Sequence, residues 1–211
     1  MAVEIELKAR LSDIEPVKER LFAIGSYLCS YRKLDTYWFS PMTACPRIRV
    51  RRVQGHNADG MAYQSAAVTF KSKAISAGIE INDEREFTVS DAGLFEELLG
   101  YLGMHKEMYK EKNGWAWAIP PEAGGRSGIV MEPGILAELS QVMGLGWFLE
   151  LEILPADSSV QTVEECRWQL LALLAKLEIP AERIESRPYG EMLAEMPMKS
   201  PPRSSPRSSP P

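Results

Sequence analysis

The chain has 211 residues, of which 45% are hydrophobic and 25% are charged, a composition that can form one well-packed core. Its formal net charge of −5 argues against a general binder of nucleic acid or anionic membranes, because such proteins usually carry an excess of Lys and Arg. Any cationic site must therefore be local.

The two ends of the chain have unlike compositions. The start carries charges at alternate positions and lacks the apolar segment of a signal peptide, and no apolar run is long enough to span a bilayer, so we expect a cytoplasmic protein. Residues 197–211 are mainly Pro, Ser and basic residues, which cannot bury enough apolar surface to offset their ordering entropy. We expect one domain at residues 1–196 and a disordered tail at 197–211. The three cysteines have no short spacing and indicate neither a disulfide framework nor a zinc site.

The first half of the chain alternates between period-two patterns, typical of strands, and one helical pattern. The stretch VEIELKAR is charged at every second position, and Pro16 and Gly25 bracket a helical apolar stripe. The expected helix is capped by Ser12 or Asp13, has Pro16 in its first turn and stops at Gly25. The expected strands are 3–10, 34–39, 47–52, 66–73 and 80–89, with a polar loop at 54–60.

The second half contains more helix. Leucines at 94, 98 and 102 form one helical stripe, and Thr162 followed by Glu165 has the spacing of a capping box that opens a helix. The expected elements are helix 91–103, strands 108–119, 135–139 and 147–154, and helices 162–177 and 189–195. About eight strands are too much sheet for a helix bundle, and they are too polar at alternate positions for a buried parallel sheet. We expect an α+β fold with an antiparallel sheet.

Charged residues follow one face of each expected strand, and the residues between them are mostly apolar. A sheet with one solvated face would explain any single strand. However, such faces usually mix the two signs, because like charges side by side repel each other, whereas here whole strands are cationic or anionic. The charged positions are Glu4, Glu6, Lys8, Arg47, Arg49, Arg51, Lys71, Lys73, Glu84, Glu86, Lys110, Lys112, Glu150 and Glu152.

A sheet curved into a tunnel, with its charged face inside, accounts for this segregation. Burying each unpaired ion in a dry interior would cost several kcal/mol, so the tunnel must be wet and occupied by something that balances the charges. Paired carboxylates without neighbouring His or Cys suit Mg²⁺ or Mn²⁺, and rows of Lys and Arg suit a chain of phosphates. The pattern therefore predicts a site for a metal ion and a polyphosphate.

A series of short motifs follows these strands in chain order: Glu4-x-Glu6-x-Lys8, LDTYWF, RIRVRR, TFKSK, Glu84-x-Glu86, YKEK, GLGWFLELE and Tyr189. Through these motifs the sequence resembles the CYTH superfamily, the triphosphate tunnel metalloenzymes, from about residue 3 to residue 193. This resemblance implies an eight-stranded antiparallel tunnel with helices packed outside, two divalent-metal positions and a triphosphate substrate. The family includes class IV adenylyl cyclases, thiamine triphosphatases and inorganic triphosphatases.

Matching positions imply roles for individual residues. Glu4, Glu6, Glu150 and Glu152 would hold metal, with Glu84 and Glu86 as further ligands or as groups that support them. The phosphate oxygens would be bound by Lys8, Arg49, Arg51, Lys71, Lys73, Lys110 and Lys112, with Arg47 as an eighth candidate. Lys8 and Glu6 are the catalytic candidates, because either could orient or deprotonate an attacking water.

The sequence departs from the family pattern before GLG. The family usually has an Asp at the position of Ser140, so an acidic ligand is missing there. Glu138, two residues earlier on the same face, could replace it, and Glu132 could approach from the preceding loop.

The layout looks closest to the class IV adenylyl cyclase group, which converts ATP to 3′,5′-cyclic AMP and pyrophosphate. The first alternative is a triphosphatase acting on thiamine triphosphate, inorganic triphosphate or a nucleoside triphosphate. The second is a non-catalytic binder of polyphosphate or nucleotide, in which Ser140 has removed a needed acid. The expected partner is a small-molecule triphosphate with Mg²⁺ or Mn²⁺, rather than nucleic acid or membrane. Tryptophans expected on the outer face make a homodimer plausible.

Overall fold

The computed structural model describes residues 2–41, 47–76, 79–120, 134–155, 157 and 159–195, and describes their side chains except at 2, 3, 71–76 and 79–84. The expected loop before residue 134 and the expected tail therefore lie outside the described residues. The described strands are β1 (Ala2–Leu11), β2 (Ser26–Phe39), β3 (Ile48–Asn57), β4 (Ala62–Ser76), β5 (Ile79–Thr88), β6 (His105–Ile119), β7 (Ile135–Val142) and β8 (Gly146–Ile153). The helices are α1 (Glu15–Ile24), α2 (Ala92–Tyr101), α3 (Val160–Lys176) and α4 (Tyr189–Ala194), with a short 3₁₀ turn, η1, at Ala181–Arg183.

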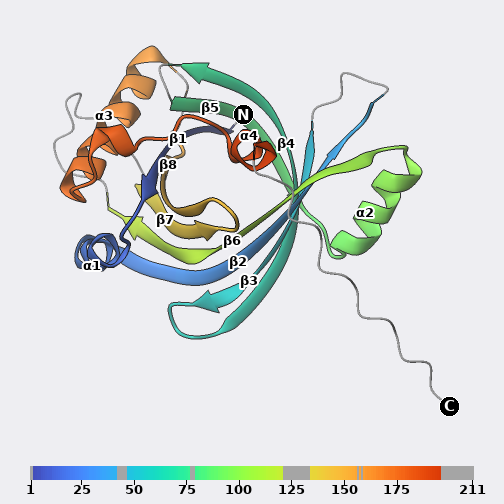
Figure 1. Cartoon of the computed structure of the whole chain (residues 1–211), viewed down its shortest axis with the longest axis horizontal. Coiled ribbons are helices and arrows are strands. Elements are labelled where there is room, and N and C mark those ends of the chain that lie inside the picture. Colours follow the sequence, from blue (N-terminus) through green and yellow to red (C-terminus); the bar gives the residue numbers. More distant parts are fainter. Residues whose placement is uncertain are drawn as a thin grey trace.

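The strands form one closed barrel in the order β1-β5-β4-β3-β2-β6-β7-β8, and every neighbouring pair is antiparallel (Figure 1). β1 closes the ring, because it pairs with β5 on one side and with β8 on the other. Closure leaves no unpaired strand edge. The predicted α+β fold with an eight-stranded antiparallel tunnel is confirmed.

Several strands are longer than predicted. The expected polar loop at 54–60 is wrong in its first part, because β3 continues to Asn57, which pairs with Cys29 at the start of β2. The chain turns after Asn57, whose backbone N–H donates to the carbonyl of Met61, and Gly60 adopts a φ of +82° that other residues rarely take. Cross-strand hydrogen bonds thus extend the strand through residues whose own propensity indicates a loop.

The main hydrophobic core lies outside the barrel. Ile5, Leu7 and Ala9 of β1 pack in one cluster with residues of β7, β8 and α3, including Leu151 and Leu170. α1 and α3 cover this side of the sheet, and α2 lies on the other side of the molecule over a smaller cluster (Figure 1). The apolar faces of the strands therefore point outward under helices, as the alternation predicts.

The helix boundaries depend on local capping. The predicted start of α3 at Thr162 is wrong, since the helix begins at Val160 and the hydroxyl of Ser159 accepts from the N–H of Thr162. Ser159 is therefore the N-cap, a role that serine performs well. No helix of the described part of the chain has the length and apolar character needed to cross a bilayer.

Helix α4 is short but has a distinctive place. Tyr189 and Met192 pack in a cluster with Val142 at the end of β7 and with Phe148 of β8. Phe148 lies on the side of β8 opposite the outer core residues Leu149 and Leu151, so α4 contacts the inner face of the barrel. In Figure 1, α4 lies within the outline of the ring of strands.

Candidate functional site

The inner face of the barrel carries the charged residues of several strands. Outward Ile5, Leu7 and Ala9 place the even-numbered side chains of β1 inside, and the pairing continues this face around the ring. On β1 and β8, Glu6 is opposite Glu152 and Lys8 is opposite Glu150. The segregated charges that the sequence places on alternate positions therefore face one lumen.

One side of the lumen is rich in carboxylates. Glu138 of β7 is opposite Glu150 of β8, and Glu150 is next to β1. We call this side the acidic wall. It consists of Glu4, Glu6, Glu138, Glu150 and Glu152.

Two carboxyl groups of the acidic wall behave as a pair. Burial, with the nearby charges of Glu150 and Glu4, raises the pKa of Glu6 to about 8. Burial would also raise the pKa of Glu150, but the Lys112 ammonium outweighs it and lowers that pKa to about 2. At neutral pH, Glu6 therefore retains a proton next to an ionised Glu150. A divalent cation bound by the two carboxyl groups could displace that proton.

The other side of the lumen is rich in cations. We call it the basic wall, made of the inner-face cations of β2, β3 and β6: Lys33, Arg49, Arg51, Lys110 and Lys112. Asp35 of β2 lies among them and is only 1% exposed. Arg51 donates to its two oxygens from Nε and Nη2 at 2.7 and 2.9 Å, and Lys110 Nζ lies 3.1 Å from Oδ2. Burial alone would raise the pKa of Asp35, but Arg51 and Lys110 hold it well below its usual range.

The two walls meet in ion pairs. Lys112 pairs with Glu150, and Lys33 pairs with Glu138. The expectation that only a bound ligand could balance the tunnel charges is therefore corrected. Strand order provides the reason, because β6 is next to β7 and strands of opposite sign lie close enough for their side chains to pair.

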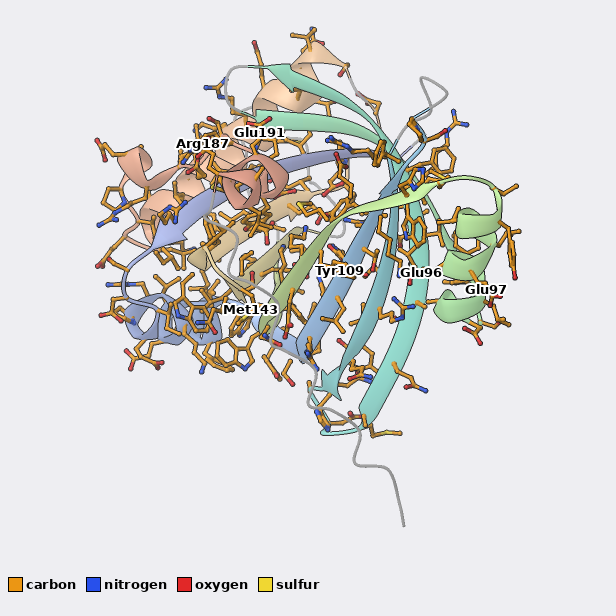
Figure 2. The ribbon with its side chains drawn as sticks, turned by 45° about the vertical axis from the view of Figure 1, so that its right-hand side comes forward. Glu96, Glu97, Tyr109, Met143, Arg187 and Glu191 are labelled. Carbon is orange, nitrogen blue, oxygen red and sulfur yellow. The ribbon has the colours of Figure 1, made fainter. Side chains whose placement is uncertain are left out.

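The aromatic ring of Tyr189 in α4 lies close to three lysine side chains of the lumen. The ammonium groups of Lys8, Lys112 and Lys110 lie 4.5, 5.1 and 5.2 Å from the centre of its ring, within the range of cation–π attraction. Lys8 Nζ also donates to the carbonyl of Arg187 at 2.8 Å. Figure 2 shows Arg187 close to Glu191 of α4, so the segment that enters α4 also holds Lys8.

Three buried hydroxyl groups in this region make no hydrogen bond of good geometry with the described residues, although Tyr31 lies near Ser140 and Glu138, and Tyr189 lies near Glu150. The three hydroxyls belong to Tyr31, Ser140 and Tyr189. Gly114 of β6 pairs with Tyr31 on one side and with Ser140 on the other, so these two hydroxyl-bearing residues flank one glycine on the inner face. Unpartnered buried hydroxyls are uncommon, and they indicate a place where water or a polar ligand is bound.

The predicted residues Arg47 and Glu86 lie away from the acidic wall. Arg47 precedes β3, has a side chain that is 68% exposed, and pairs with Glu107. Glu86 is 49% exposed and accepts from Thr69 Oγ1 at 2.9 Å, near Arg49. Since Glu6 pairs with Glu80, six residues before Glu86, Glu86 is displaced along β5 by about 20 Å at the usual rise per residue.

Four predicted positions cannot be placed in the site by their side chains. The backbones of Lys71 and Glu84 are paired on β4 and β5, and that of Lys73 is paired with Asn82. The side chains of Lys71, Lys73 and Glu84 lie outside the described residues, as does the whole of Glu132.

Lys33 and Asp35 were not among the predicted site residues. The expected strand at 34–39 contained Asp35 but excluded Lys33, whereas β2 starts at Ser26. With that longer strand, the alternation of Tyr31, Lys33 and Asp35 would have placed all three on one face. Ser140 and Glu138 both lie on the inner face of β7, and the carboxylate of Glu138 pairs with Lys33.

The donor set only partly assembles a metal site. Among the described side chains, no group of three or more Asp, Glu, His or Cys is arranged to hold one ion. Glu6 and Glu150 are in contact, and Glu4 is close enough to raise the pKa of Glu6. Hard carboxylate oxygens of this kind suit Mg²⁺ or Mn²⁺.

The comparisons with known proteins give matches in structure only. The sequence matches no protein-family model and no curated protein. The PH1819 protein from Pyrococcus horikoshii has a TM-score of 0.73 with this chain at 22% identity, over 91% of this chain and 98% of its own. A candidate adenylate cyclase from Vibrio parahaemolyticus has a TM-score of 0.69 at 17% identity, over 90% of this chain and 97% of its own.

The name of a third similar structure includes both adenylyl cyclase and triphosphatase activity. HpAC1 from Hippeastrum, a candidate adenylyl cyclase described as having a dominant triphosphatase activity, has a TM-score of 0.64 at 14% identity, over 94% of this chain and 98% of its own. Similarity at such low identity establishes a common fold, and one fold can host several activities. The chain therefore shares its eight-stranded tunnel fold with these three structures.

Proposed function

We propose that this chain is a metal-dependent enzyme that acts on a triphosphate inside the tunnel. The observation that carries the proposal is the division of one closed lumen into an acidic wall and a basic wall. A polyphosphate needs cationic donors along its length, and a divalent ion needs carboxylates beside that chain. A lumen built only for stability would gain little from these ions, because buried ion pairs rarely stabilise more than apolar residues of equal size.

The acidic wall would hold Mg²⁺ or Mn²⁺ through Glu4, Glu6, Glu150 and Glu152. A bound ion there supplies charge neutralisation on the phosphate oxygens and orients the nucleophile. The proton on Glu6 must leave when the metal binds, so metal affinity should rise with pH. Glu138, already paired with Lys33, would complete the acidic surroundings at the position where Ser140 provides no charge.

The basic wall would bind the phosphate oxygens. Arg51 and Lys110 are fixed by Asp35, whereas Lys112 and Lys33 are held by carboxylates of the acidic wall. Metal binding at Glu150 would release Lys112 toward the phosphates, and the phosphate chain would compete with Glu138 for Lys33. Lys8, held by Tyr189 and the Arg187 carbonyl, would contact the phosphoryl group nearest α4.

Cyclisation of ATP is the first candidate reaction. The ribose 3′-oxygen would attack the α-phosphorus and release pyrophosphate, and the cations of the basic wall would stabilise the charge that develops on the leaving group. Similarity to the candidate adenylate cyclase from Vibrio parahaemolyticus supports this choice.

Hydrolysis of a triphosphate is the second candidate reaction. Water would attack the terminal phosphorus, oriented by Lys8 or by a glutamate of the acidic wall. The observation that favours it is the similarity to HpAC1, for which a dominant triphosphatase activity is described.

One product analysis separates these reactions. Purified full-length chain is incubated with ATP, thiamine triphosphate or inorganic triphosphate, each with Mg²⁺ or Mn²⁺, and the products are resolved by ion-exchange chromatography. Cyclic AMP with pyrophosphate identifies the cyclase, and a diphosphate with orthophosphate identifies the triphosphatase. Unchanged substrate that still raises the melting temperature identifies a binding protein and rejects the enzyme. Absence of both turnover and stabilisation rejects the triphosphate site itself.

A further inference from the structure

Asp35 is the most buried acidic side chain on the described inner face, at 1% exposure. It is opposite Arg51 on β3 and opposite Lys110 on β6, so one carboxylate connects three neighbouring strands. Both oxygens accept from Arg51, and one also lies 3.1 Å from Lys110. The hydroxyl of Tyr37 lies 3.5 Å from Oδ2.

The paired contact with Arg51 fixes orientation as well as charge. Two parallel N–H···O bonds define the plane of the guanidinium group, which a single contact would leave free to rotate. Arginine has five N–H donors, and Asp35 accepts from the single N–H of Nε and from one N–H of Nη2 of Arg51. One carboxylate therefore holds two cations in place, leaves a net positive charge, and leaves donors for another anion.

The position of Asp35 relative to the acidic wall is also informative. In the ring of eight strands, β2 is four strands from β1 in either direction, so Asp35 and Glu6 belong to opposite walls. A phosphate chain between the walls would meet the Glu6–Glu150 pair on one side and the Arg51–Lys110 pair on the other.

We propose that Asp35 is a positioning residue that fixes Arg51 and Lys110 so that both bind the same phosphoryl group of the substrate. This inference rests on the proposed function and adds to it the residue that organises the basic wall. Asp35 acts through the two cations and does not itself contact the substrate.

The sign of one measurement distinguishes positioning from simple electrostatics. If Asp35 only competed with the phosphates for the two cations, removing its charge would tighten the binding of an anion. If it positions the cations, removing it weakens that binding, although the lumen becomes more positive. A residue that only stabilises the fold would change the melting temperature and leave the affinity of the folded protein unaltered.

The test uses inorganic triphosphate as the probe, with binding measured by calorimetry on the full chain in EDTA and in Ca²⁺. The variants are Asp35→Asn, which keeps one acceptor oxygen, and Asp35→Ala, which keeps none. We expect affinity to fall in the order wild type, Asp35→Asn, Asp35→Ala, with a loss of about tenfold or more for the alanine variant. If Asp35→Ala does not fold, as judged by its thermal transition, the isosteric Asp35→Asn variant decides the sign.

A second substitution tests whether Asp35 acts through Arg51. Arg51→Lys keeps the positive charge but removes the paired contact, so it should weaken binding to a similar degree. Adding Asp35→Asn to Arg51→Lys should then cost little more. Independent, fully additive effects of the two substitutions would overturn the proposal.

The structure offers a matched control on the outer face. Glu96 of α2 also holds one arginine of β3 and one lysine of β6, namely Arg52 and Lys106. Figure 2 shows Glu96 beside Glu97 at α2, away from Arg187 and α4. Glu96→Gln removes the same charge from a similar triad and should leave triphosphate affinity within about twofold of wild type.

The outcomes separate the two levels of inference. If both Asp35 variants bind inorganic triphosphate as tightly as the wild type or more tightly, the positioning role is wrong and the proposed function is unaffected. If the wild-type protein does not bind inorganic triphosphate under either condition, the positioning role is overturned, and the product analysis with all three triphosphates then decides the proposed function.

Discussion

The acidic wall and the basic wall solve the same electrostatic problem in different ways. In the acidic wall, Glu6 avoids the charge of Glu150 by keeping its proton, with a pKa raised by burial and by its acidic neighbours to about 8. In the basic wall, Asp35 is at least as buried, yet Arg51 and Lys110 keep its pKa well below the usual range. The less buried of the two carboxyl groups thus has the raised pKa, because neighbouring charges decide the sign of each shift.

On the proposed function, this difference assigns one ligand to each wall. Metal would displace the proton of Glu6 in the acidic wall. The cations near Asp35 are already oriented and would bind an anion. Between the walls, Lys33 pairs with Glu138 and Lys112 pairs with Glu150, and these pairs would compete with the two ligands.

The largest effect should come from neutralising the acidic wall. Glu6→Gln and Glu152→Gln each remove one carboxylate that the proposed metal requires, so metal-dependent turnover should fall about 100-fold or more. The fold should be retained, because glutamine has nearly the size and shape of glutamate and neither side chain belongs to the apolar core. Steady-state assays with Mn²⁺ and Mg²⁺, beside thermal unfolding, measure both effects. Normal activity in the two variants would mean that the metal lies elsewhere.

Breaking the contact between the walls should mainly affect stability. Lys112→Met leaves Glu150 and Glu138 buried without that partner, which should cost about 3–5 kcal/mol of unfolding free energy at neutral pH. The pKa of Glu150 is lowered from 4.5 to about 2, so its stabilising contribution is present above about 4.5 and is lost as pH falls toward 2. Urea unfolding of wild type and variant should therefore converge with acidification. A constant difference across this range would show that Lys112 does not hold Glu150.

The contribution of Glu6 to the free energy of unfolding should have the opposite pH dependence to that of Glu150. Its pKa is raised from 4.5 to about 8, so the folded state retains a proton that the unfolded state releases, and this contribution to stability is lost as pH rises through that interval. Glu6→Gln cannot lose this proton. The variant should therefore gain thermal stability relative to wild type between pH 5 and pH 8 in EDTA, whereas equal pH profiles would place Glu6 in a different environment.

The sequence predicts the inner and outer faces of the strands for a physical reason. Period-two alternation is a local property, so the inward positions of Glu4, Glu6 and Lys8 follow from the sequence of β1 alone. The resemblance to the tunnel family then supplied closure of the sheet.

What the sequence could not predict depends on which strands become neighbours. The pairing of Asp35 with Lys110 requires β2 to lie beside β6, and the pairing of Lys33 with Glu138 requires β6 beside β7. Neither adjacency is visible in a local pattern, because loops and helices separate these strands in the chain. The packing of Tyr189 against the inner face likewise depends on the path of the chain after α3.

The smallest expected effect tests the second contact between the walls. Lys33 and Glu138 are each 14% exposed and pair directly, so a double-mutant cycle with Lys33→Met and Glu138→Gln should give a coupling free energy of about 1 kcal/mol. Burial lowers the pKa of Lys33 and opposes its charged form, which limits the net gain from the pair. The same cycle repeated with Mg²⁺ and inorganic triphosphate should give a smaller coupling, because both partners would then contact ligand. A coupling that is unchanged by the two ligands would mean that this pair stays closed during binding and that only Lys112 and Glu150 open.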